Sequence, residues 1–378
     1  MAGLYIHVPF CAALCSYCTF TRGLLDEALK ARFVDALVTD IRRHADAVPV
    51  ESIYFGGGTP SLLSVEELSR ILEACRGAFD IAADAEVTLE ANPESVSTPT
   101  AEGYRAAGVN RVSLGVQSFR PDELARLGRV HSAGRSESAV RELRAAGFDN
   151  VSLDLMLWLP EQRPEQLMES VARLIAVGPE HASLYLLEIY PNAPLKDEVA
   201  RAGWTVVPDD VAADMYLAAM EALDGAGYRQ YEISNVARPG RESRHNLAYW
   251  TDGDWLAFGP GAHGADASSR WRVVSSTADY VARVREGRDV VAERWARTGP
   301  ARCEEALFMG LRLSEGIDLR RIHARYGVDV WARYGEALQP FVEAGHLVHE
   351  PTRRIFLTRT GMLVANDAMT VFLGPGMR

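Results

Sequence analysis

Three cysteines stand within eight positions near the start of the chain, in the stretch HVPFCAALCSYCTF over residues 7–20. Cys11, Cys15 and Cys18 have the spacing C-x3-C-x2-C, whereas iron-sulfur clusters of the four-iron type usually take four cysteine ligands. A cluster held by three thiolates keeps one coordination position for a substrate, as catalytic zinc sites do. The spacing therefore favours a cluster with an open iron.

Two other interpretations of this loop remain open. His7 could complete a zinc site, although zinc sites usually combine two C-x2-C knuckles and the sequence has no second one. Alternatively, the three cysteines could be ordinary core residues. Cys75 lies on the apolar face of a predicted helix and Cys303 stands alone, so both are predicted to be core residues.

The elements that must hold the loop alternate between strands and helices. Helix-period segments, such as SVEELSRILEACRGAF over residues 64–79, separate six β-rich runs. The alternation predicts an α/β fold with a parallel sheet, either a partial barrel or an open doubly wound sheet. The six runs are LYIHV (4–8), SIYFGG (52–57), EVTLEA (86–91), RVSLGVQS (111–118), NVSLDLML (150–157) and ASLYLLEI (182–189).

The 378 residues are too many for one small core, and we expect three segments. Residues 1–237 form the β/α domain, 238–299 form a connection with little periodicity, and 300–378 form a smaller, mainly helical domain. The last segment has the element order of a winged helix, yet it holds ten Arg against nine Asp or Glu. Without a basic face, it is expected to have a packing or lid role rather than to bind DNA.

Charge and hydropathy restrict the partners of the chain. The net charge of -11 argues against binding to nucleic acid or to anionic lipid. No apolar run is long enough to cross a bilayer, and residues 1–11 lack the pattern of a signal peptide. We therefore expect a cytoplasmic protein without stable membrane insertion, in which five cysteines favour metal binding over disulfides.

Glycines and polar residues gather at the predicted strand ends. The stretch FGGGTPS (55–61) follows the second strand, and its glycines allow the backbone to approach a ligand closely. Because the carboxyl ends of parallel strands meet at one edge, polar residues there converge. Each alone could equally be a structural cap, but together they favour a site formed by Glu90, Gln117, Asp154 and Glu188.

The cysteine loop after a first strand resembles the signature of radical S-adenosylmethionine (SAM) proteins. The resemblance implies a partial (β/α)6 barrel and a [4Fe-4S] cluster on Cys11, Cys15 and Cys18, whose open iron chelates SAM. It also implies that an electron from the cluster cleaves SAM to methionine and a 5′-deoxyadenosyl radical, while the protein positions the cofactors.

Further motifs are similar to those of oxygen-independent coproporphyrinogen III oxidases and of their relatives, the heme chaperones. These motifs are YIHVPFC, GGGTPS, EANP, GVQSF, LGRVH and YEISNVARPG, and they cover most of the chain. The resemblance implies contacts of Tyr5, Gly57 and Glu90 with the SAM on the cluster. The positions that match contacts to a second SAM in the oxidase are Gly58, Thr59, Gln117, Arg129 and Asp154.

Several features separate the two branches of this family. The oxidase has a long arm before its cysteine loop and a fourth loop cysteine, whereas here the loop begins at Cys11 and Phe20 takes that place. RHNLAYW (244–250) matches the H-N-x-x-Y-W motif of the heme chaperones. His245 would offer an imidazole to heme iron and the two aromatics flat apolar faces, although alone they could merely anchor a loop. Trp158, where relatives commonly have glycine, could narrow a SAM or porphyrin pocket.

The leading hypothesis is a heme-binding radical-SAM-type protein that delivers heme to apo-hemoproteins and carries a [4Fe-4S] cluster and SAM. The enzyme alternative converts coproporphyrinogen III to protoporphyrinogen IX by oxidative decarboxylation of two propionates. A third possibility is a protein without heme, either an iron-sulfur protein that uses SAM only as a structural ligand or a zinc protein. No catalytic residue is assigned.

Overall fold

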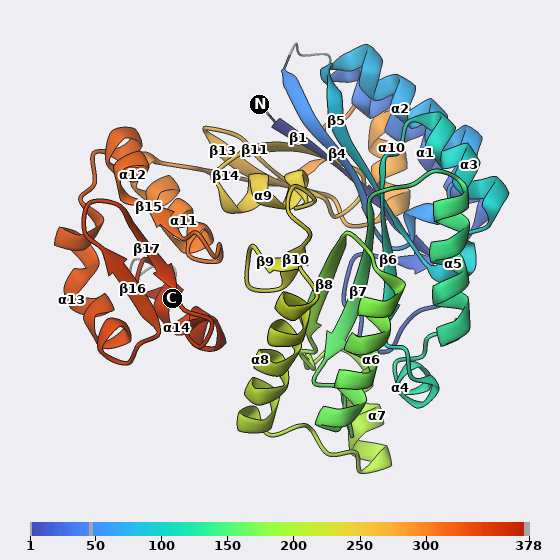
Figure 1. The fold of residues 1–378 in the computed structure, drawn as a ribbon. Coiled ribbons are helices and arrows are strands. Elements are labelled where there is room, and N and C mark those ends of the chain that lie inside the picture. Colours follow the sequence, from blue (N-terminus) through green and yellow to red (C-terminus); the bar gives the residue numbers. More distant parts are fainter. Residues whose placement is uncertain (1, 45–47, 374–378) are drawn as a thin grey trace.

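The computed structural model describes residues 2–44 and 48–373. They form a curved sheet with helices along its outer face and a smaller C-terminal domain at one side (Figure 1). Within the described ranges, no helix is long and apolar enough to span a bilayer.

Six parallel strands form the centre of the sheet, and they confirm all six predicted strands. They pair in chain order, as β1 (Ala2–Val8), β4 (Pro49–Gly57), β5 (Asp80–Ala91), β6 (Arg111–Gln117), β7 (Val151–Leu157) and β8 (His181–Leu186). The helices between and after them are α1 (Glu27–Arg43), α2 (Val65–Ala78), α3 (Thr98–Ala107), α4 (Pro121–Arg126), α5 (Ala133–Ala145), α6 (Pro164–Val177), α7 (Pro194–Ala202) and α8 (Asp209–Gly225).

The main core lies between these strands and their helices. Leu4, Ile6 and Val8 alternate along β1 and are fully covered by the outer layer. Helix α2 begins with a capping box, in which Ser64 Oγ accepts from the Glu67 N–H (3.1 Å) and the Glu67 carboxylate accepts from the Ser64 N–H. Its predicted apolar face is buried, and Cys75 lies in this core as expected.

The segment 238–299 extends the sheet on the free side of β1, a feature that the sequence pattern did not predict. Strand β11 (Asp254–Phe258) pairs parallel with β1, and three antiparallel strands follow it. These strands have only three to six residues, too few for a clear periodic signal. They are β12 (His263–Ala265), β13 (Ser269–Val273) and β14 (Val291–Ala296), and the helices of the segment are α9 (Arg244–Trp250) and α10 (Thr277–Arg285).

Beyond β8, residues 229–237 form two short strands separated by a turn. Strands β9 (Arg229–Gln230) and β10 (Asn235–Ala237) form an antiparallel pair, and β10 also pairs with β8. A second short pair, β2 (Phe10–Cys11) with β3 (Gly23–Leu24), encloses the cysteine loop after β1.

The C-terminal domain contains three helices, a hairpin and a last helix, in line with the winged-helix order of elements predicted from the sequence. It forms its own core, which contains Cys303, Leu307, Leu338, Ile355 and Phe372. Its elements are α11 (Gly299–Gly310), β15 (Ile317–Asp318), α12 (Leu319–Tyr326), α13 (Val330–Glu343), β16 (Leu347–Glu350), β17 (Arg354–Leu357) and α14 (Ala365–Thr370).

Asp252, two residues beyond α9, fastens that helix to the C-terminal domain. Its side chain is only 6% exposed and pairs with Arg297 (3.1 Å), Arg302 (3.0 Å) and Arg325 (3.0 Å). The Tyr326 hydroxyl donates to the same carboxylate. One buried anion therefore neutralises cations from the end of β14, from α11 and from α12.

We predict that Asp252→Asn lowers the free energy of unfolding by at least about 2 kcal/mol, because buried cations are left short of their counter-charge. Urea unfolding followed by tryptophan fluorescence measures this loss. Asp279→Asn is the control, since that carboxylate forms a partly exposed pair with Arg283 within α10 and should cost less than about 1 kcal/mol. Equal losses in the two variants would contradict the central role of Asp252.

Candidate functional site

The inner face of the sheet, opposite the helices, is polar and carries the candidate site. The register places Gly3 beside Ser52, Tyr5 beside Tyr54, and His7 beside Gly56. Successive residues of a strand point to opposite faces, so these residues share the inner face while leucines and isoleucines fill the outer core. We call the carboxyl ends of the six parallel strands the barrel mouth and their amino ends the barrel floor.

The cysteine loop lies at the barrel mouth, directly after β1. Cys11 is buried, whereas Cys15 and Cys18 are partly exposed. Arg22 Nη2 donates to the carbonyl oxygens of both Cys15 (3.0 Å) and Cys18, and Arg129 Nη1 lies 3.6 Å from Cys15 Sγ. Burial raises the pKa of the Cys11 thiol, while a hydrogen bond with Thr59 and the positive charge of Arg22 act in the opposite direction and favour the thiolate form that binds metals.

The geometry of this loop fits a cluster better than a zinc ion. The Tyr5 hydroxyl donates to His7 Nδ1 (3.1 Å) and His7 Nε2 donates to Thr21 O (2.7 Å), so both ring nitrogens are engaged. Across residues 2–44 and 48–373, no three His, Cys, Asp or Glu side chains are gathered closely enough to hold one ion. Because both nitrogens of His7 are engaged, this residue is not positioned to complete a zinc site with the three cysteines.

The glycine loop after β4 packs directly against the cysteine loop. The Gly58 N–H donates to Val8 O (2.8 Å) and the Thr59 N–H to Phe10 O (2.7 Å). A Cβ on Gly58 would lie 2.6 Å from Phe10 O, and one on Gly57, where φ is +114°, would lie 2.6 Å from the His7 ring. Glycine is therefore required here for the two loops to meet.

Two carboxyl groups lie next to this loop on the inner face. Glu90 accepts hydrogen bonds from the Tyr54 hydroxyl (2.8 Å) and from the Gly57 N–H (3.2 Å), and Asp154 accepts one from Ser113 Oγ (3.3 Å). Burial raises the pKa of Glu90 to about 7 and that of Asp154 to about 6. A cationic ligand such as a sulfonium or an ammonium would favour their ionised forms.

Gln117 and Arg129 meet around Gly115 at the end of β6. Arg129 Nη2 donates to Gly115 O (2.5 Å), and a Cβ on Gly115 would lie 2.9 Å from the Gln117 amide nitrogen. Gln117 itself has a φ of +66°, a left-handed conformation that non-glycine residues adopt at a cost. The structure thus gathers the SAM-contact candidates and the three cysteines at the barrel mouth.

Two residues singled out from the sequence lie away from this group. Glu188 follows the end of β8 and is exposed. The indole nitrogen of Trp158 donates to Ala212 O (2.7 Å) in α8, on the outer side of the sheet. The suggestion that Trp158 narrows a pocket is therefore wrong, because the indole points away from the inner face.

His245 lies at the opposite end, in the barrel floor. The side chain is 1% exposed, with Nδ1 2.9 Å from Ser52 Oγ and Nε2 2.8 Å from the Tyr249 hydroxyl. The Glu86 carboxylate accepts from the backbone N–H groups of Arg244 and His245 and so holds the amino end of α9. Burial lowers the pKa of His245 to about 3, and the neutral imidazole is not presented as an open ligand.

Sequence reasoning missed several residues that build this site. Arg22 organises the cysteine loop, and Ser52, Tyr54 and Glu86 line the inner face below the glycines. The alternation in SIYFGG already places Ser52 and Tyr54 on the same face as Gly56, so that signal was available. Arg22 follows no periodic pattern and is recognisable only from the folded loop.

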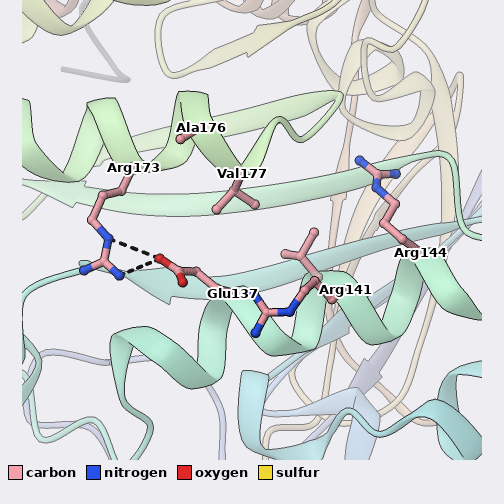
Figure 2. Close-up of a pocket in the computed structure, with 7 residues that line it drawn as sticks. Glu137, Arg141, Arg144, Arg173, Ala176 and Val177 are labelled. Carbon is pink, nitrogen blue, oxygen red and sulfur yellow. Dashed lines mark hydrogen bonds and ion pairs between the residues drawn. The ribbon is translucent and has the colours of Figure 1, made fainter.

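A groove of about 470 Å³ on the outer surface, between α5 and α6, does not form part of this site. Figure 2 shows that Glu137 and Arg173 form an ion pair across it (2.5 Å). Arg144 is paired with Glu180 (2.8 Å). Ion pairs thus engage charged residues of this groove, and the groove lies on the outer surface, away from the inner face. The barrel mouth and the barrel floor therefore remain the candidate site.

Comparison with known proteins first defines the class. The Radical SAM superfamily model matches residues 5–174, and the HemN C-terminal domain model matches residues 298–364. The fold is similar to the structure of coproporphyrinogen III oxidase (HemN) from Escherichia coli, with a TM-score of 0.86 over 98% of this chain and 89% of that chain, at 23% identity. The fold and the three-cysteine loop define a radical SAM protein, and this class implies a [4Fe-4S] cluster and SAM.

Full-length relatives define the family within this class. The heme chaperone HemW of Bacillus subtilis is 32% identical over 378 residues, covering 99% of this chain and 100% of that protein. HemW of Mycobacterium tuberculosis (strain H37Rv) is 38% identical over 379 residues, covering 98% and 95%. The chain belongs to the heme chaperone HemW family, which confirms the branch predicted from Phe20 and RHNLAYW.

We predict that Gly58→Ala lowers the free energy of unfolding of the cofactor-free protein by about 1–3 kcal/mol, because the added Cβ overlaps Phe10 O. Gly77→Ala is the matched control, since a Cβ there meets no atom within 4 Å in α2 and should stabilise by up to about 1 kcal/mol. Chemical denaturation measures both. A Gly58→Ala protein as stable as wild type would show that the two loops are not in tight contact.

We also predict a pH effect from Glu90. Its pKa is raised from 4.5 to about 7 in the folded state, so between these values the folded state binds more protons than the unfolded chain. The free energy of unfolding therefore falls as pH rises through this window, by at most about 3 kcal/mol. Glu90→Gln should flatten the profile between pH 5 and pH 8, whereas the exposed Glu73→Gln serves as control. Superimposable profiles of wild type and Glu90→Gln would contradict the raised pKa.

Proposed function

We propose that this chain is a cytoplasmic carrier that binds heme and delivers it to apo-hemoproteins. The observation that carries the proposal is its similarity, over nearly its whole length, to proteins named heme chaperones. The intact HNLAYW motif on α9 and the three-cysteine loop support it from the chain's own residues. The shared fold with the oxidase, at 23% identity, carries no argument for the same reaction.

In this proposal, Cys11, Cys15 and Cys18 hold a [4Fe-4S] cluster with an open iron that binds SAM. When bound, the pair supplies a one-electron centre beside the inner face. Arg22 orders the loop by binding its carbonyl groups, and Arg129 stabilises the thiolate of Cys15. The residues proposed to contact SAM are Tyr5, Gly57 and Glu90, and those proposed for a second SAM are Gly58, Thr59, Gln117, Arg129 and Asp154.

Heme, as cargo, is proposed to bind through His245, Tyr249 and Trp250 of α9. Because His245 is buried and both nitrogens are engaged, binding must break its hydrogen bonds to Ser52 and Tyr249. The helix has only seven residues, and its withdrawal from the barrel floor also breaks the hydrogen bonds of two backbone N–H groups to Glu86. A carrier whose ligand residue is covered until cargo arrives would keep a reactive site closed.

We also propose that the three segments divide this work. Residues 1–237 would hold the cluster and SAM, 238–299 would carry the heme motif, and 300–378 would hold that motif in place. Arg312 of the last segment lies 4.4 Å above the Trp250 ring and pairs with buried Glu232 (3.0 Å). The contact supports a role of the C-terminal domain in positioning α9 rather than in binding DNA.

We predict that the purified protein binds heme stoichiometrically, with a change in the Soret band, and that His245→Ala weakens binding at least about tenfold by removing the axial ligand. The exposed His323→Ala is the control and should bind like wild type. Unchanged binding by His245→Ala would disprove this heme site. Formation of protoporphyrinogen IX from coproporphyrinogen III, with SAM and a reductant under anaerobic conditions, would favour the oxidase instead.

A further inference from the structure

A chain of direct contacts connects the barrel mouth with the barrel floor through one side chain, Tyr54. At the mouth, its hydroxyl donates to Glu90 Oε1 (2.8 Å), while Glu90 Oε2 accepts from the Gly57 N–H (3.2 Å). At the floor, the Tyr54 ring stacks on the imidazole of His245, with ring centroids 5.1 Å apart and planes inclined by 24°. Tyr54 therefore touches a proposed SAM residue and the proposed heme ligand at once.

We propose that Tyr54 is a positioning residue that couples SAM binding at the barrel mouth to the release of His245 from the barrel floor. The inference rests on the proposed function, since it names how that same site is regulated. It assigns a role to a residue that neither binds the cluster nor touches heme iron.

The mouth end of the coupling depends on Glu90. Both of its oxygens are engaged in the structure, one by Tyr54 and one by Gly57. A cationic group of SAM that approaches this carboxylate competes for the same oxygens. Among the described residues Glu90 is the acceptor for the Tyr54 hydroxyl, so a carboxylate that turns toward SAM leaves the buried phenol without its partner. Rotation or displacement of the Tyr54 side chain relieves this cost.

The floor end depends on close packing around His245. A Cβ on Gly3 would lie only 2.9 Å from the imidazole, so β1 closes that side of the ring. Tyr5 lies near the same ring, with centroids 6.4 Å apart, and Ser52 holds Nδ1. The stacked Tyr54 ring is tied to the mouth by its hydrogen bond to Glu90, and Tyr5 by the hydrogen bond of its hydroxyl to His7. When the Tyr54 side chain shifts, one face of the His245 imidazole is no longer covered, and α9 leaves the barrel floor more easily.

The two binding events then assist each other. SAM favours the released position of His245, heme requires it, and linkage makes the factor equal in both directions. Couplings of this kind typically change affinities by about 5-fold to 150-fold. SAM is therefore expected to tighten heme binding, although the two sites lie toward opposite ends of the parallel strands.

The test compares wild type with Tyr54→Phe, which keeps the ring and removes the hydroxyl. Tyr228→Phe is the matched control, because that buried hydroxyl donates to Pro179 O (2.6 Å) away from the inner face. Ser52→Ala is a second comparison. It removes the hydrogen bond to His245 Nδ1 and keeps the hydrogen bond between Tyr54 and Glu90. Thermal unfolding establishes that all four proteins are folded.

The first readout needs no heme. The cluster-loaded proteins are treated with diethyl pyrocarbonate, with and without SAM, and modification of the peptide that contains His245 is followed by mass spectrometry. SAM should accelerate modification at least about 5-fold in wild type, Tyr228→Phe and Ser52→Ala. In Tyr54→Phe the ring still covers His245 and no hydroxyl is left without a partner, so modification should stay slow and SAM should add nothing.

The second readout is heme affinity from the Soret band, with and without SAM. SAM should tighten binding in wild type and in Tyr228→Phe, but not in Tyr54→Phe. A full SAM effect in Tyr54→Phe, or no SAM effect on modification of His245 in wild type, would overturn the coupling. Absence of heme binding in wild type would instead refute the proposed function, and the modification experiment would still decide the coupling.

Discussion

The alternation of side chains along six parallel strands is the constraint on which the remaining structure depends. Outward residues such as Leu4 and Ile6 pack under the helices, and inward residues such as Tyr5 and His7 must then face a space that no helix of the outer layer covers. Parallel strands in such a sheet place their carboxyl ends at one edge. The cysteine loop, the glycine loop and the two buried carboxyl groups therefore meet at the barrel mouth.

The same alternation creates the barrel floor, where the inner face needs a different partner. Helix α9 fills this position, and Glu86 holds its amino end by accepting two backbone N–H groups. The candidate heme ligand is thus used structurally in this conformation, as a neutral buried histidine. This structural role and the proposed role as heme ligand exclude each other, which would give the proposed carrier a switch between a closed and a loaded state.

The strong periodic signals of the sequence sufficed for the six strands of the parallel core, β1 and β4 to β8, for α2 and for the helices of the C-terminal domain. The cysteine loop was recognisable because three thiols in eight positions have few structural explanations. The burial of His245 was not predictable, because its hydrogen bond to Ser52 joins positions 193 residues apart. Likewise, β11 to β14 are too short for a periodic signal, and the direction of the Trp158 indole depends on its contact with α8.

The central claim is that α9 leaves the barrel floor when heme binds through His245. Hydrogen-deuterium exchange of the peptide covering residues 243–251, measured with and without heme, tests it most directly. The account predicts that these amides, protected in the free protein, exchange faster once heme is bound, while peptides from β4 and β5 stay protected. Unchanged protection of α9 in a protein that ligates heme through His245 would contradict it.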